Sequence, residues 1–199
     1  MSLAYVSLPG RGETDAFLAA LAARLEDCGV RVAGTVQTNT ERDCTHHCDM
    51  DVRVLPDGPV IRINQDLGAG STGCRLDPGA LEQAVAEVAP RLVGADLLIV
   101  NKFGKHEAEG RGFRHLIAEA LATGKPVLLG VNGINRTAFD RFADGLAEEL
   151  PGSLDAALDW AERHLPAAAP AWREPSLRAV RPDAPHNIRS ALASKRLLA

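Results

Sequence analysis

Residues 95–131 read ADLLIVNKFGKHEAEGRGFRHLIAEALATGKPVLLGV and decide the fold class. After Asp96 the run to Val100 is apolar throughout, as is typical of a strand buried on both faces of a sheet. Residues 112–122 then carry apolar side chains at helical spacing, and residues 126–131 form a second apolar run. A strand, a helix and a strand in this order favour an α/β domain with a mostly parallel sheet.

The same alternation continues on both sides of this stretch. Apolar positions recur at helical spacing in several segments, and short apolar runs separate them. Strands are expected over residues 3–8 and 30–38, and helices after Asp77, near residues 137–146 and over residues 154–164.

Residues 50–64 interrupt the alternation of strands and helices. Pro56-Asp57-Gly58-Pro59 is a strong turn signal between residues 50–55 and 60–64, two strand-like runs. The first of these runs alternates in polarity, as a half-buried strand does. The sequence therefore predicts an inserted β-hairpin.

Length and composition favour one domain followed by a tail. The chain has 199 residues, of which 46% are apolar, and both values are ordinary for a single globular domain. Residues 1–165 hold all the strand-like and helix-like segments of the α/β pattern. Residues 166–199 are expected to be a Pro/Ala-rich, mildly basic C-terminal tail, either solvated or serving as an arm of a homodimer.

Charge and hydropathy exclude several classes of partner. The formal net charge of −4 argues against general binding to nucleic acid. The longest apolar runs fall far short of the roughly 20 residues that a membrane span needs. The first residues carry neither the basic region nor the apolar core of a signal peptide. A cytoplasmic protein with neither a membrane nor a nucleic-acid partner is expected.

Residues 7–14, which read SLPGRGET, follow the first expected strand. A phosphate-binding P-loop has the pattern Gly-x-x-x-x-Gly-Lys-Ser/Thr in the same context. Gly12 and Thr14 are in register with it, but Ser7 replaces the first glycine and Glu13 replaces the lysine. A carboxylate at that position would repel a triphosphate, by about 4 kcal/mol for one close contact. The helix N-terminus still favours some anion, and the candidate binding residues are Gly10, Arg11, Gly12 and Thr14.

The strand that begins near residue 95 also carries an unexpected charge at its end. A hydrolase would place its magnesium-holding acid there, whereas this chain has Asn101 and Lys102. The two charges therefore look exchanged, with Glu13 in the place of a lysine and Lys102 in the place of an acid. We expect Glu13 and Lys102 to pair across the site, and residues 1–165 to be a degenerate P-loop-like domain.

Residues 95–131 resemble the corresponding stretch of the thermophile-type nucleoside-triphosphatases, whose Gly-Lys-x-Glu turn is present as Gly104, Lys105 and Glu107. A closer resemblance, over about residues 3–150, is to an uncharacterised bacterial family of unknown function that is associated with molybdenum utilisation genes. Its motifs stand here as Cys48-Asp49-Met50, Gln65-Asp66-Leu67-Gly68 and residues 73–77. This resemblance implies a P-loop NTPase-like three-layer sandwich with a mostly parallel sheet, and an oxyanion or metal context.

The glycine-rich residues 66–75 are a second candidate for binding anions. Closely spaced glycines and hydroxyls offer N–H and O–H donors, and an arginine adds a fork of donors for a tetrahedral oxyanion. In a parallel sheet this loop should meet the other loops that follow strands. The residues added to the anion or nucleotide site are Gly68, Gly70, Ser71, Thr72, Arg75, Lys102 and Lys105.

Residues 43–50 and the glycine-rich loop together hold three cysteines. Thiols in a reducing compartment stay reduced, and three thiolates with one imidazole complete a tetrahedral zinc set. Soft thiolates equally suit copper(I) or an iron–sulfur centre. The candidate ligands are Cys48, Cys74, Cys44 and His46, although the spacing has only one loose pair and also fits a polar loop with unrelated thiols.

These patterns favour an accessory protein over an enzyme. The preferred hypothesis is a cytoplasmic protein that binds molybdate, another oxyanion or a thiolate-bound transition metal, on a scaffold that has lost triphosphate hydrolysis. Its partners would be the small anion or metal ion and a metal-utilisation protein. The alternative is a nucleoside-triphosphatase that uses magnesium and in which Glu107 orients water. A third class, a redox or partner-binding adaptor using the cysteines, is also open.

Overall fold

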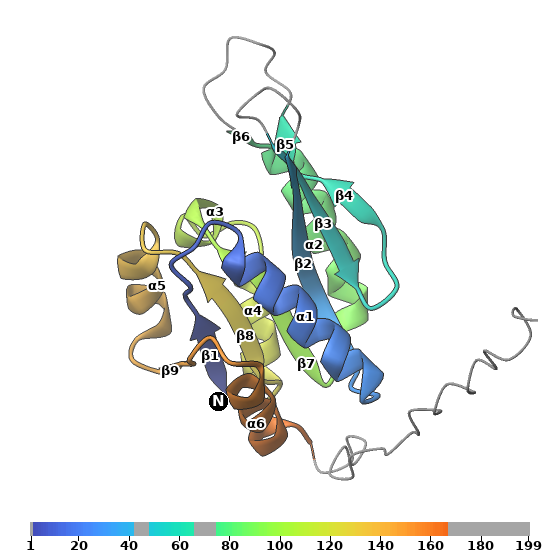
Figure 1. Ribbon diagram of the computed structural model, residues 1–199, viewed down its shortest axis with the longest axis vertical. Coiled ribbons are helices and arrows are strands. Elements are labelled where there is room, and N and C mark those ends of the chain that lie inside the picture. The colour runs from blue at the N-terminus through green and yellow to red at the C-terminus, as the bar shows by residue number, and fades with distance from the viewer. Residues whose placement is uncertain (1, 42–47, 66–74, 167–199) are drawn as a thin grey trace, which may run out of the picture.

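The computed structural model describes residues 2–41, 48–65 and 75–166. Within these residues a seven-stranded sheet has the order β4-β3-β2-β7-β8-β1-β9 (Figure 1). Its strands are β1 (Leu3–Val6), β2 (Val32–Glu41), β3 (Cys48–Leu55), β4 (Val60–Arg62), β7 (Leu97–Phe103), β8 (Val127–Val131) and β9 (Ala147–Glu149). Strands β1, β2, β7, β8 and β9 are parallel, and β3 runs antiparallel to both of its neighbours. A small antiparallel pair, β5 (Asn64–Gln65) and β6 (Arg75–Leu76), lies apart from the main sheet.

Helices cover both faces of the sheet and complete three layers (Figure 1). Helices α1 (Glu13–Asp27) and α6 (Leu154–His164) pack on one face. The other face carries α2 (Pro78–Leu92), α4 (Arg114–Ala122) and α5 (Arg136–Ala143), and the short α3 (Lys105–Ala108) follows β7. The expected α/β three-layer arrangement with a mostly parallel sheet is confirmed.

Strand β7 shows why residues 95–131 decide the fold. Leu97 and Ile99 pack with α1 and α6, whereas Leu98 and Val100 pack with the helices of the opposite face. Because successive side chains of a strand point to opposite faces, an unbroken apolar run is what two covered faces require. The strand continues beyond Val100 to Phe103, so Asn101 and Lys102 belong to it and do not begin a loop.

The inserted hairpin is also confirmed, and β2 pairs with it along its β3 strand. β3 and β4 are antiparallel and flank the expected turn. β2 pairs with β7 from Val32 as far as Thr35. It then continues beside β3 to Glu41. β2 therefore projects beyond the carboxyl ends of the central strands, and it carries polar residues with it.

Some short elements were not expected, and most of the expected tail is not described. The short elements α3 and β9 were not expected, because four and three residues of mixed polarity carry no periodic signal. The tail expected over residues 166–199 lies outside the described residues except for its first residue. No helix of the described segments is long and apolar enough to cross a membrane.

The start of β7 is fixed by an ion pair. Asp96 is 5% exposed and accepts hydrogen bonds from the backbone N–H, Nε and Nη2 of Arg31, the residue before β2. These bonds lower the pKa of Asp96 below its ordinary value, against the opposing effect of burial. The pair joins the amino ends of two neighbouring parallel strands, so Asp96 has a structural role.

Replacing Asp96 by Asn should lower the free energy of unfolding at pH 7 by about 2 kcal/mol, since charged hydrogen bonds are lost. The carboxylate stabilises the fold above its unfolded pKa of about 3.9 and loses that effect as it is protonated in the folded state. The deficit of Asp96→Asn should therefore shrink as the pH falls below about 4. Urea unfolding at several pH values measures it, with the exposed Asp159→Asn as a control that changes little.

Candidate functional site

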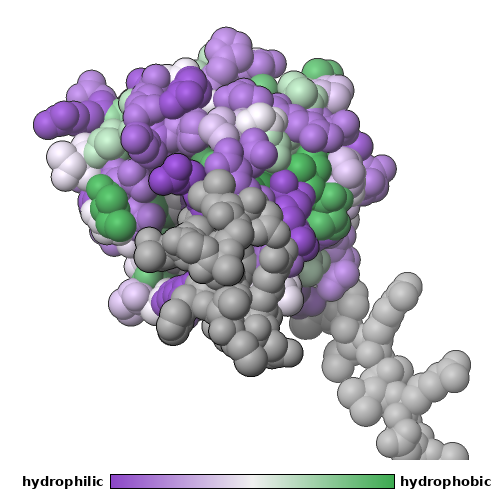
Figure 2. Space-filling model, turned by 90° about the horizontal axis from the view of Figure 1, so that it is seen from above, coloured by the Kyte–Doolittle hydropathy of each residue, from purple (hydrophilic) through white to green (hydrophobic). Residues whose placement is uncertain are grey.

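The carboxyl ends of β1, β7 and β8 open into a cavity of about 710 Å³, here called the first cavity. The parallel strands bring their following loops to one edge, as expected for this class of fold. Viewed from this end, the described surface is mainly hydrophilic, with separate hydrophobic areas (Figure 2). The lining comes from the loop after β1, the first turn of α1, Lys102 of β7, and residues 130–134, which end β8 and follow it.

The loop between β1 and α1 closes on itself. The N–H of Gly10 donates to Oε2 of Glu13 at 3.0 Å, and the N–H of Leu8 donates to Oγ1 of Thr14 at 3.1 Å. A Cβ on Gly10 would stand 2.2 Å from the Glu13 carboxyl carbon, so this approach requires glycine. Gly12 has φ 79° at the N-cap of α1, which also favours glycine. The carboxylate of Glu13 therefore accepts a hydrogen bond from the backbone of a residue that lines the cavity.

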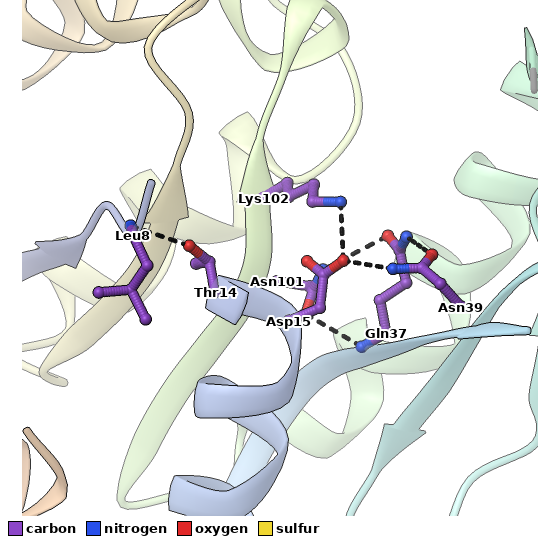
Figure 3. A network of polar contacts seen from close by, with 7 residues as sticks. All are labelled: Leu8, Thr14, Asp15, Gln37, Asn39, Asn101 and Lys102. Atoms are coloured by element: carbon purple, nitrogen blue, oxygen red, sulfur yellow. Dashed lines mark hydrogen bonds and ion pairs between the residues drawn. The ribbon is translucent and has the colours of Figure 1, made fainter. Parts of the chain in front are cut away.

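Asp15, also in the first turn of α1, is the centre of a polar network (Figure 3). It is only 3% exposed. Its Oδ1 accepts from Nδ2 of Asn101 at 3.0 Å, and its Oδ2 accepts from Nδ2 of Asn39 at 2.6 Å. Nζ of Lys102 lies 3.0 Å from the same Oδ2. The buried negative charge thus has two amide donors and an ammonium, as a stable buried carboxylate needs.

Gln37 extends the network into β2. Its backbone N–H donates to Oδ1 of Asn101 at 3.0 Å, and its Nε2 donates to Oδ1 of Asn39 at 2.6 Å. The amide oxygens and nitrogens of the three residues thereby hold one another in fixed orientations. The network links α1, β2 and β7 at the carboxyl edge of the sheet.

The expected pair between Glu13 and Lys102 is not formed. Lys102 does contact a carboxylate of α1, but the partner is Asp15. Asp15 is buried against the sheet, whereas Glu13 is exposed and accepts a hydrogen bond from Gly10 in the preceding loop. A shift of two positions along a helix turns a side chain by more than half a circle, and this explains the difference.

The residues of the expected anion site fall into two cavities. Gly10, Arg11, Gly12 and Thr14 line the first cavity. Arg75 and Lys105 line a second cavity of about 600 Å³, bounded by β2, β3, β7, α2 and α3. Lys102 borders both. The remaining expected residues, Gly68, Gly70, Ser71 and Thr72, lie outside the described residues.

Glu107 is buried and bonded to the backbone. Its Oε2 accepts from the N–H of Gly104 at 2.8 Å, and its Oε1 accepts from the N–H of Phe113 at 3.1 Å. The first bond is that of a helix capping box at the start of α3. Both oxygens hold the chain in place, so orienting a water molecule would require one of these bonds to break.

The expected thiolate site lies mostly outside the described residues. Cys44, His46 and Cys74 are not described, and Cys48 is the first residue of β3. The described residues hold no group of three or more His, Cys, Asp or Glu side chains placed to hold a metal ion. The metal site stays a prediction.

Asp15, Gln37 and Asn39 were not among the residues expected at the site. One signal for them is present in the sequence, because Gln37 and Asn39 stand two apart in a strand and so share one side of it. Another is Asn101, a polar residue that directly follows the apolar run of a buried strand and must find partners. Neither signal identifies the partner, since the contacts join segments up to 87 residues apart.

Comparison with known proteins identifies the family of this chain. Residues 3–160 match the family described as "Protein of unknown function (DUF2478)". The chain belongs to this family. The molybdenum import ATP-binding protein ModC 2 of Bradyrhizobium diazoefficiens is 37% identical over 139 residues, which are 69% of this chain. The match spans only 16% of that relative, so most of the relative has no counterpart in this chain.

Two solved structures share the fold of this DUF2478 chain. A human cancer-related nucleoside triphosphatase has a TM-score of 0.52 and 18% identity, over 75% of this chain and 87% of its own. THEP1 from Aquifex aeolicus has a TM-score of 0.55 and 15% identity, over 83% of this chain and 97% of its own. At these identities the likeness shows a P-loop NTPase-like fold. It confirms the fold that the sequence resemblance implied.

A double-mutant cycle tests the central ion pair. Asp15→Asn and Lys102→Met should each destabilise the protein, and their effects should be coupled by about 1 kcal/mol, because Asp15 is buried but Lys102 remains 43% exposed. The coupling free energy is measured by urea unfolding of the four proteins. The cycle of Glu13→Gln with Lys102→Met is the matched control and should be additive. Additive losses in the Asp15 cycle would contradict the network.

Proposed function

We propose that this protein is a cytoplasmic accessory protein that binds a small oxyanion in molybdenum handling and does not hydrolyse nucleoside triphosphates. The observation that carries the proposal is that the charged side chains beside the first cavity are bonded to groups of the protein itself. The carboxylate of Glu13 sits on the loop N–H of Gly10, and the ammonium of Lys102 is held by Asp15. A triphosphate site needs the opposite arrangement, with a free lysine facing the phosphates.

Charge balance argues against a triphosphate in the first cavity. Arg11 and Lys102 contribute positive charge there, and Glu13 and Asp15 lie at the same loop and helix turn. A triphosphate without its metal carries several negative charges, and each contact with a carboxylate costs about 4 kcal/mol. A small oxyanion brings less charge and needs fewer cationic partners.

The residues around the loop do not fit the magnesium ion that a hydrolase of this fold implies. Magnesium prefers oxygen ligands at near-octahedral positions. Here the end of β7 presents an amide and an ammonium, and both oxygens of Asp15 already accept hydrogen bonds. The Thr14 hydroxyl accepts the N–H of Leu8. Magnesium would have to displace these bonds.

The loop nevertheless keeps the geometry of an anion site. The N–H of Gly10 already points at a negatively charged oxygen, that of Glu13. Glu13 is exposed, so its carboxylate can leave when an external oxyanion takes the same N–H group. The cavity of about 710 Å³ is large enough for a tetrahedral oxyanion and its hydration water.

Molybdate is the proposed anion because of the relative named for molybdenum import. Since this chain matches only a small part of that relative, we assign it an accessory role and not the relative's ATP-binding role. The competing function is a nucleoside-triphosphatase, which the register of Gly12 and Thr14 and the shared fold favour.

Equilibrium dialysis against molybdate, with sulfate and phosphate in parallel, tests the proposal. The protein should take up molybdate, and Glu13→Gln should bind it about three to ten times more tightly, because the competing negative charge is removed. The exposed Asp159→Asn is the control and should bind as the unchanged protein does. The same samples should release no phosphate from ATP with magnesium.

Two results would contradict this function. The first is a lack of oxyanion uptake by both the unchanged protein and Glu13→Gln. The second is magnesium-dependent phosphate release from a nucleoside triphosphate, which would restore the enzyme.

A further inference from the structure

The second cavity differs from the first in the chemistry of its walls. Its floor is the apolar face of the sheet between β3 and β7, with Val52 and Val100. Leu81 of α2 and Phe113 close two of its sides. All four side chains belong to the main core cluster and are at most 8% exposed. The apolar lining that a ligand can reach is that of Met50 and Leu76, which are half-buried and pack against this cluster. A volume of about 600 Å³ lies within the range of small-molecule sites.

The rim of this cavity is cationic. Arg75 and Lys105 contribute a guanidinium and an ammonium group from separate elements, and His106 lies beside Lys105. Lys102 also lines the cavity, but its ammonium is paired with Asp15. Among the lining residues that the structure describes, the acidic one is Glu107, which is buried and bonded to two backbone N–H groups. Nζ of Lys105 lies 3.6 Å from a carboxylate oxygen of Glu109. Both side chains are exposed, so this ion pair contributes little free energy.

Polar atoms of the floor could orient a ligand. Thr35 and Gln37 are buried residues of β2 that line the cavity among the apolar side chains. Small-molecule sites typically combine an apolar lining with a few such polar groups. The cavity therefore has an apolar body, a small number of polar contacts and a positive mouth.

We propose that the second cavity binds an organic anion whose flat apolar ring packs against Met50 and Leu76 and whose carboxylate, sulfonate or phosphate group faces Arg75 and Lys105. An inorganic oxyanion would leave these apolar side chains in contact with water and gain nothing from them. An uncharged ring compound would leave the cationic rim unused. The site is separate from the oxyanion loop, so the inference does not depend on the proposed function.

Calorimetric titration with three probes separates the contributions. 2-Naphthyl phosphate has a ring and a charge, 2-naphthol has the ring alone, and inorganic phosphate has the charge alone. The probe with both should bind at least about ten times more tightly than either of the others. The double variant Arg75→Glu with Lys105→Glu should lower its affinity by about tenfold or more.

A second variant tests the apolar part without altering the rim. Met50 is half-buried and lines the cavity, so Met50→Trp should fill part of the space and lower the affinity for 2-naphthyl phosphate. The control for the double charge variant is Arg24→Glu, which reverses the charge of an exposed arginine in the last turn of α1. It should leave the affinity unchanged. Thermal unfolding of each variant confirms that the fold is intact.

Three results would overturn the proposal. 2-Naphthyl phosphate could bind no more tightly than inorganic phosphate, which would indicate attraction to charge alone. Its affinity could match that of 2-naphthol, which would indicate attraction to the ring alone. It could also bind equally well to the double charge variant and to Met50→Trp, which would place the probe elsewhere, including at the first cavity.

Discussion

A buried carboxylate at the start of a helix constrains the carboxyl edge of this sheet. Asp15 is almost fully buried in the first turn of α1. The positive end of the helix dipole favours a negative charge at this place, but burial without partners would cost several kcal/mol. Lys102 supplies the opposite charge, and Asn39 and Asn101 supply hydrogen bonds. The loop before α1, the end of β7 and the extension of β2 are held together by this one requirement.

This constraint also determines what the site has left for a ligand. A lysine engaged by Asp15 and a loop N–H engaged by Glu13 are no longer available to phosphates unless these contacts break. The scaffold resembles nucleoside-triphosphatases in fold, yet the charges at its phosphate-type loop are arranged in another way. Lys102, one partner of this ion pair, also lines both cavities.

The fold could be predicted where burial writes a pattern into the sequence. The apolar run before Asn101 and the turn signal at residues 56–59 identify a central strand and a hairpin, since both follow from local rules. β9 was not predicted because its three residues, none of which is buried, carry no periodicity. Within the site, the position of the loop was predictable from its place between a strand and a helix. The pairing of Lys102 with Asp15 was not, because it depends on which face of α1 meets the sheet. Glu107 was expected to orient water in the alternative function, and a carboxylate three residues after Gly104 is also the spacing of a capping box.

The most direct test of the account is nuclear magnetic resonance of the Gly10 amide in isotope-labelled protein, titrated separately with molybdate and with ATP and magnesium. The account holds that this N–H exchanges the Glu13 carboxylate for an external oxyanion. It predicts a saturable shift of the Gly10 signal with molybdate and none with ATP and magnesium. A saturable shift of the Gly10 and Gly12 signals with ATP and magnesium, and none with molybdate, would contradict it.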